Sequence, residues 1–172
     1  MNIDDDDFTL LGVPERFALE AAQLDRRWRE LQASVHPDRF AAQGAAAQRI
    51  AMQWSVRVNQ AYQRLKDPLK RAAYLCERRG APVDAERNTA MPRDFLMQQM
   101  AWREALDEAG DGAAIQALAG QVEEHERTLL GQLQDLLDVR NDAAAAAAQV
   151  RALMFVGRFR QDIEHRLEAL EQ

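Results

Sequence analysis

Apolar side chains recur every three or four residues along most of this chain, a spacing typical of amphipathic helices. One apolar stripe, expected on a helix over about residues 20–35, is formed by Leu24, Trp28, Leu31 and Val35. A second, on a long helix expected over 45–66, is formed by Ile50, Trp54, Val58, Ala61 and Leu65. Shorter patterns over 8–13 and 69–79 complete four predicted helices, which end near Pro14, Pro37 and Asp67-Pro68 because proline disfavours helix continuation.

The second half of the chain shows three further helical patterns. Gly80, Pro82 and the polar run 84–89 indicate a linker over about 80–92. Pro92 suits the first position of the helix that follows. The three helices are expected over about 93–109, 113–139 and 142–171, and their short connections favour an antiparallel three-helix bundle. In the last helix we expect a core stripe of Leu153, Val156, Ile163, Leu167 and Leu170.

Composition supports an all-α fold and excludes several classes of function. Good helix formers dominate, and alternating runs of β-branched residues are missing. The net charge of −6, without a basic stripe, argues against a general nucleic-acid binder. The single cysteine, Cys76, forms no intrachain disulfide and is expected to be a small buried side chain. No stretch of about 18 apolar residues predicts a membrane span.

Nothing in the sequence indicates catalysis, a metal site or a cofactor. His36, His125 and His165 lie far apart, and the Glu-x-x-His pairs of a di-iron bundle are not matched. Gly-rich phosphate loops and nucleophile elbows are also missing. The acidic start, Asp4 to Asp7, fits neither a secretory signal nor a transit peptide. We therefore expect a non-enzymatic protein without a bound cofactor.

A His36-Pro37-Asp38 tripeptide, here the HPD motif, opens a loop predicted over 36–44 between two helices. Pro37 stiffens the turn, and Asp38 offers a carboxylate to an arginine of a binding partner. Arg26 and Arg29 point away from the apolar stripe of the preceding helix, so they form a positive face beside the motif. The alternative reading is a proline that ends a helix, followed by a capping aspartate.

The helix expected over 93–109 is apolar on two faces. Phe95, Trp102 and Leu106 fall within about 40° of each other and form a core stripe. A second group, about 100–200° away, contains Leu96, Met97, Met100 and Glu104. This second face either binds a partner or is covered by the linker or the first domain. Phe155, about 200° from Leu153 on the last helix, also points away from its core stripe and either binds a partner or packs within the chain.

Five segments, taken in chain order, resemble a J-domain. They are the opening Phe8–Val13, the HPD motif, the segment 59–65, Asp67-Pro68 and the segment 71–74. The stretch 95–106 is similar to the matching helix of the HscB family of J-domain co-chaperones. The resemblance implies a four-helix J-domain over 1–79, whose second and third helices form a hairpin tipped by the HPD motif. It also implies a client-binding bundle over 93–172.

The resemblance implies two partners and a role in iron–sulfur cluster assembly. The J-domain would stimulate ATP hydrolysis by a DnaK-type chaperone of the HscA kind, through the HPD motif with Arg26 and Arg29. The bundle would bind the cluster scaffold IscU through a surface that maps onto Leu96, Met97, Met100, Glu104 and Phe155. The chain departs from the family at Gln98 and Ala101, where acidic residues are common.

Two other functions remain open at this stage. The chain is either a J-domain protein for a different client or a structural helical adaptor with an inert loop. Some eukaryotic relatives carry an N-terminal cysteine-rich segment, which this chain lacks. Together with the lack of a transit signal, this favours the bacterial cytoplasm.

Overall fold

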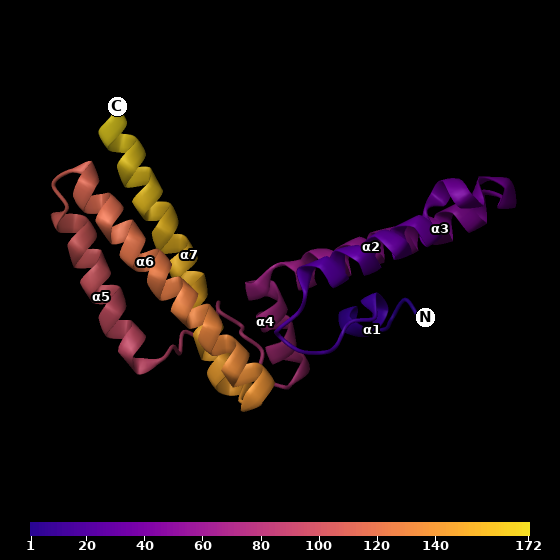
Figure 1. Ribbon diagram of the computed structural model, residues 1–172, viewed down its shortest axis with the longest axis horizontal. Coiled ribbons are helices and arrows are strands. Elements are labelled where there is room, and N and C mark those ends of the chain that lie inside the picture. The colour runs from indigo at the N-terminus through magenta and orange to yellow at the C-terminus, as the bar shows by residue number, and fades with distance from the viewer. The chain divides into compact units, whose positions relative to one another are not determined.

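The computed structural model describes residues 1–172 and is built of helices, with no strands (Figure 1). It divides into two compact units, Met1–Leu75 and Cys76–Gln172. The boundary between them falls within helix α4, whereas the sequence places a linker at 80–92. The all-α fold predicted from the periodicity is confirmed.

The first unit is a helical hairpin supported by two shorter helices. In chain order its elements are α1 (Asp7–Leu11), α2 (Ala21–Val35), the 3₁₀ helix η1 (Pro37–Gln43), α3 (Ala45–Lys66) and α4 (Pro68–Arg78). Helices α2 and α3 lie side by side (Figure 1). Their buried side chains include Leu24, Val35, Val58, Ala61 and Leu65, which belong to the two predicted stripes.

Helix α1 is short because both of its ends are fixed by polar groups. The Asp6 carboxylate caps the start by accepting the Thr9 N–H at 3.0 Å and the Thr9 hydroxyl at 2.6 Å. Gly12 ends the helix with φ of +64°, a left-handed conformation that glycine adopts without strain. A Cβ at Gly12 would lie 2.7 Å from the Arg27 guanidinium, which donates to the Leu11 carbonyl at 3.1 Å. Arg27 therefore serves the fold of this unit.

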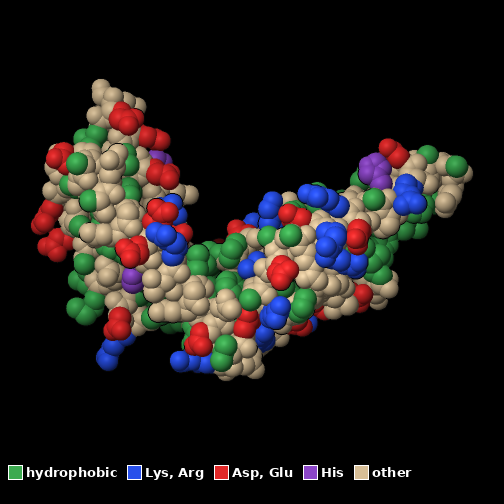
Figure 2. Space-filling model, in the orientation of Figure 1, with side chains coloured by type: hydrophobic (Ala, Val, Ile, Leu, Met, Phe, Trp, Pro, Cys, Tyr) green, Lys and Arg blue, Asp and Glu red, His purple; other side chains and the backbone are tan.

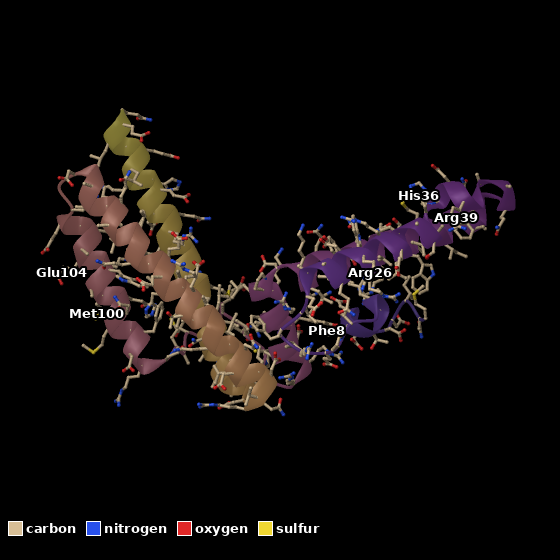
Figure 3. All side chains as sticks on the ribbon, in the orientation of Figure 1. Phe8, Arg26, His36, Arg39, Met100 and Glu104 are labelled. Carbon is tan, nitrogen blue, oxygen red and sulfur yellow. The ribbon has the colours of Figure 1, made fainter.

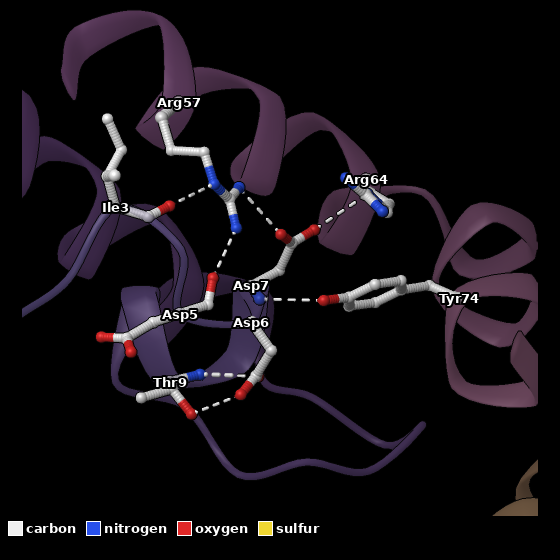
Figure 4. Close-up of polar contacts among 8 residues, drawn as sticks. All are labelled: Ile3, Asp5, Asp6, Asp7, Thr9, Arg57, Arg64 and Tyr74. Carbon is white, nitrogen blue, oxygen red and sulfur yellow. Dashed lines mark hydrogen bonds and ion pairs between the residues drawn. The ribbon is translucent and has the colours of Figure 1, made fainter. Parts of the chain in front are cut away.

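A buried carboxylate ties the N-terminal segment to the hairpin (Figure 4). Asp7 lies 2.9 Å from both the Arg57 and the Arg64 guanidinium, and its backbone N–H donates to the Tyr74 hydroxyl at 3.1 Å. Arg57 also donates to the carbonyls of Ile3 and Asp5. Because one carboxylate satisfies two cations, the start of α1 is fixed against α3 and α4.

The second unit is a three-helix bundle formed by α5 (Arg93–Glu108), α6 (Gly112–Gln134) and α7 (Ala143–Glu171). A π-helical turn, η2 (Asp135–Val139), extends α6. Asp111 and Asp142 cap α6 and α7 by accepting backbone N–H groups. Aromatic rings fill one part of the core: Trp102 stacks on Phe159 at 5.8 Å and meets His125 edge to face at 5.1 Å.

The predicted linker is held against the second unit by a buried arginine. Arg151 on α7 donates to the carbonyls of Val83 and Ala90. Arg79 donates to the Leu137 carbonyl at the end of α6. Residues 80–92 are therefore irregular in backbone but have fixed polar contacts inside this unit.

Several local predictions are wrong. The HPD loop continues as η1, since Pro37 sets the φ of a first helical turn and the Arg39 N–H reaches the His36 carbonyl. Pro92 lies just before α5 instead of inside it. Two residues of the predicted core stripes are exposed: Ile50, at 57%, lies near the start of α3, and Leu170, at 52%, lies near the end of the chain. Ile50 lies beside the buried stripe and not on it, because the next residue, Ala51, faces the core and is buried.

Candidate functional sites

The HPD motif lies at the tip of the α2–α3 hairpin, where Figure 3 labels His36. The His36 backbone leaves helical geometry with ψ of 130°, as expected for a residue that precedes proline. Its ring Nδ1 accepts the Asp38 backbone N–H at 3.2 Å. The same Nδ1 atom lies 3.7 Å from the Asp38 carboxylate.

The Asp38 carboxylate is the most accessible group of the motif. Its side chain is 90% exposed and receives no hydrogen bond from any other side chain. The backbone around it is fixed, because Arg39 reaches the Ala33 carbonyl at 3.1 Å with its side chain and the His36 carbonyl with its N–H. The motif thus presents a free carboxylate from a constrained turn, which suits capture of a cationic group.

A basic face follows the same hairpin. Arg26 and Arg29 on α2 are both exposed and make no ion pair within the chain. Figure 2 shows Lys and Arg side chains gathered over α2 on the face in view. Arg27, in contrast, is engaged with Leu11 and Glu30. The two arginines chosen from the helical spacing are therefore available to a partner.

Polar bonds fix α2 against α3 behind that face. The Tyr62 hydroxyl donates to Asp25 at 2.6 Å, and Trp28 stacks on the Tyr62 ring at 4.4 Å. The hydrogen bond to Asp25, followed by burial, raises the pKa of Tyr62 above its ordinary value. Nearer the tip, Gln32 and Ser55 exchange hydrogen bonds. These bonds hold the tip at a set position relative to Arg26 and Arg29.

An apolar surface lies on α5, here named the α5 face and formed by Leu96, Met97, Met100 and Glu104. Leu96 is 48% exposed, Met97 75% and Met100 74%, while Phe95, Trp102 and Leu106 are buried on the opposite side. Met100 and Glu104 point away from α6 and α7 in Figure 3. The helix is thus apolar on two faces, as the sequence indicates, and the second face is open.

Phe155 on α7 lies beside Met100. The two side chains, with Gln99 and Arg103, line a surface depression of about 330 Å³. Phe155 is half-buried because its ring packs edge to face on Phe95 at 5.8 Å and stacks on Phe159 at 6.1 Å. The structure therefore places Phe155 next to the α5 face with only part of its ring accessible.

Arg103 and Gln99 are components of this depression that the sequence reading missed. The Arg103 guanidinium lies over both Phe155 and Phe159, at 5.7 and 5.6 Å, and pairs with Asp162 at 3.3 Å. Gln99 and Arg103 lie on the edge of α5 that faces Phe155 of α7. Helical spacing predicts that they are neighbours, but the sequence did not show that α7 lies beside this edge.

Cys76 is buried, as expected, and its burial raises the thiol pKa to about 11. No group of three or more His, Cys, Asp or Glu side chains is placed to hold a metal ion. None of the helices combines the length and apolar character needed to cross a membrane.

Comparisons with known proteins show which family this chain belongs to. A family model described as the HSCB C-terminal oligomerisation domain matches residues 91–164. The co-chaperone protein HscB homolog of Bordetella petrii is 51% identical over 160 residues, covering 92% of this chain and 94% of that protein. The chain belongs to the HscB family of co-chaperones. The homolog of Burkholderia mallei is 49% identical and covers 99% of both chains.

Two solved structures of the HscB family share the fold. The chaperone HscB from Vibrio cholerae is 35% identical, with a TM-score of 0.78, and covers 96% of this chain and 99% of that chain. The human co-chaperone protein HscB is 25% identical, with a TM-score of 0.82, and covers 96% and 84%. The resemblance inferred from the sequence is confirmed, and membership in the HscB family supports a co-chaperone role in iron–sulfur cluster assembly.

Proposed function

We propose that this co-chaperone stimulates the ATPase of an HscA-type chaperone and delivers the scaffold IscU to it. In this proposal residues 1–79 act as the J-domain, 80–92 connect, and 93–172 bind the client. The proteins named above as HscB homologs come from bacteria, which favours action in the bacterial cytoplasm. The chain itself catalyses no covalent step.

The observation that carries the proposal is the exposed Asp38 carboxylate on a turn fixed by Pro37, beside Arg26 and Arg29. The carboxylate would accept charge-assisted hydrogen bonds from an arginine of the chaperone. The two arginines would speed encounter with an acidic patch there, more than they would tighten the complex.

The α5 face supports the second part of the proposal, which is binding of IscU as the client. Leu96, Met97 and Met100 would bury apolar surface against IscU, and methionine side chains adapt to the shape of a partner. Glu104 and the accessible part of Phe155 would border the contact. Because both sites belong to one chain, binding at each raises the effective concentration of client near the chaperone.

The matched family also favours a second property, self-association of the C-terminal unit. That family is described as an oligomerisation domain, and it corresponds to residues 91–164 of this chain. We take this as support for a monomer–oligomer equilibrium alongside client delivery.

The test is the steady-state ATPase rate of the purified HscA-type chaperone with the wild-type protein or with Asp38→Asn. The substitution keeps the size of the side chain and removes its charge, so we expect stimulation to be lost. Glu20→Gln is the matched control, because it removes one exposed carboxylate of the same unit away from the tip. Full stimulation by a folded Asp38→Asn protein would refute the proposal and leave an inert adaptor.

A further inference from the structure

The end of the α2–α3 hairpin that carries the HPD motif has apolar side chains that α1 does not cover. Helix α1 has 5 residues and spans about 7.5 Å, whereas the 22 residues of α3 span about 33 Å. The ion pairs from the start of α1 reach α3 at Arg57 and Arg64, in the half of α3 that lies away from the tip. The half of α3 nearer the tip, which His36 and Arg39 mark in Figure 3, is therefore left open on this side.

A groove of about 400 Å³ lies on this open side, here named the tip groove. Its lining includes Met1, Val35, Phe40, Ala47, Ile50 and Trp54. At 100° per residue, Ala47, Ile50 and Trp54 fall within about 60° of each other, so they form one wall of the groove along α3. Ile50 is 57% exposed and Met1 70%. Large apolar side chains that are exposed together around a concave surface are typical of a binding site for an apolar group.

The tip groove is continuous with the HPD motif. Val35 directly precedes His36, and Phe40 follows Asp38 by two residues on η1. In a 3₁₀ helix, two residues lie about 4 Å apart along the axis and point about 120° apart. The Asp38 carboxylate is therefore free to solvent while Phe40 lines the groove, and a partner that reaches Asp38 lies within about one side chain's length of the groove.

The chemistry of the tip groove favours an apolar occupant. No charged side chain lines it, and Gln43 is the only polar residue in its wall. Water against such walls finds few hydrogen-bond partners, so its displacement by an apolar side chain is favourable. The hairpin tip thus offers two adjacent sites of different character, a carboxylate for a cation and a groove for an apolar group.

We propose that the tip groove receives an apolar side chain of the chaperone, next to the cationic group that binds Asp38. This inference rests on the proposed function, because it adds a second contact to the same interface. The groove contributes affinity through buried area, whereas Asp38 triggers hydrolysis. Loss of the groove therefore weakens docking of the chaperone, and loss of the Asp38 charge abolishes its stimulation.

Two substitutions test the groove in opposite ways. Ile50→Asn removes an exposed apolar side chain from its wall, and Ala47→Leu fills the groove with a residue that favours a helix. Each should raise the concentration of this protein that gives half-maximal stimulation of the chaperone ATPase about ten-fold, because the partial burial of one aliphatic side chain is lost. Maximal stimulation should fall much less than this, since Asp38 is intact.

The controls make the same changes beside the groove. Val56→Asn alters another exposed β-branched residue of α3, about 120° around the helix from Ile50, and Ala46→Leu enlarges the exposed neighbour of Ala47. Both should behave like the wild type, and circular dichroism should show all four variants folded. The ten-fold difference between Ile50→Asn and the wild type should persist at high salt, because apolar contacts are not screened.

The outcomes separate this inference from the proposed function. Wild-type half-maximal concentrations in both folded groove variants, with stimulation lost in Asp38→Asn, would overturn the groove contact and keep the proposed function. Absence of stimulation by the wild type would refute both. An equal loss in Val56→Asn would show that the effect is not specific to the groove and would overturn the contact. Weaker binding of IscU to Ile50→Asn in calorimetry would assign the groove to the client and overturn its assignment to the chaperone.

Discussion

The two candidate sites of this protein rely on different physical properties. The HPD motif is a small polar group on a turn fixed by a proline, backbone hydrogen bonds and the contacts between α2 and α3. The α5 face is an open apolar surface of long, flexible side chains. The first depends on the position of one carboxylate, and the second depends on contact area. A single substitution should therefore abolish the action of the first and only reduce that of the second.

The largest expected effect is on the stability of the first unit, which carries the HPD motif. Asp7→Asn removes a buried charge that satisfies Arg57 and Arg64. Breaking a fully buried pair costs about 3–5 kcal/mol, and the partial exposure of Arg64 lowers our expectation to about 2–3 kcal/mol. Chemical denaturation would measure the free energy of unfolding.

Asp4→Asn serves as its control, because Asp4 is exposed and belongs to the same acidic run. IscU binding should be unchanged in both proteins under conditions where they stay folded. Equal stability of the two variants would mean that Asp7 does not fix the N-terminal segment against the hairpin. The claim that the HPD motif is carried by a rigid unit would then lose its support.

The next effect concerns the apolar surface. Leu96→Ala with Met100→Ala removes exposed apolar groups and should leave the fold unchanged by circular dichroism. Each truncation at an interface core costs about 1 kcal/mol, so the pair should weaken IscU binding roughly thirty-fold in calorimetry.

Stimulation of the chaperone by this double variant in the absence of IscU should match the wild type. The matched control is Val139→Ala, an exposed apolar residue of the same unit outside the α5 face. Unchanged affinity in the double variant would remove the α5 face from the client site.

The smallest expected effect concerns the basic face. Arg26→Ala with Arg29→Ala should slow association with the chaperone several-fold at low salt, with little change in dissociation, because exposed charges steer encounter. The difference in association rate between the variant and the wild type should disappear as ionic strength approaches about 1 M. Stopped-flow kinetics at several salt concentrations would measure it. An equal loss at all salt concentrations would show that these arginines act by direct contact instead.

Periodicity predicted most of the architecture because the apolar stripes are long and proline and glycine mark their ends. Helix α3 has the predicted bounds, and α1 ends before Pro14 as expected. The same periodicity identified the second face of α5, since Met97 and Met100 have no place on the stripe of Phe95 and Trp102.

Other features depend on contacts between elements that a single stripe does not encode. Ile50 is exposed because its neighbour Ala51 takes the core-facing position of α3, a choice between adjacent apolar residues that periodicity left open. Asp7 looks like one of four equivalent aspartates in the sequence, and only the positions of Arg57 and Arg64 distinguish it. Phe155 was expected to point outward, and its half-burial against Phe95 required knowing which helix lies beside α7.

The central claim is that one chain joins a chaperone-activating site to a client-binding site. Its most direct test is the ATPase rate of the HscA-type chaperone with IscU and this protein, singly and together. We predict that the two stimulate synergistically, and that synergy is lost with Asp38→Asn and reduced with Leu96→Ala and Met100→Ala. Stimulation that is merely additive would contradict the claim, because the two sites would then act independently.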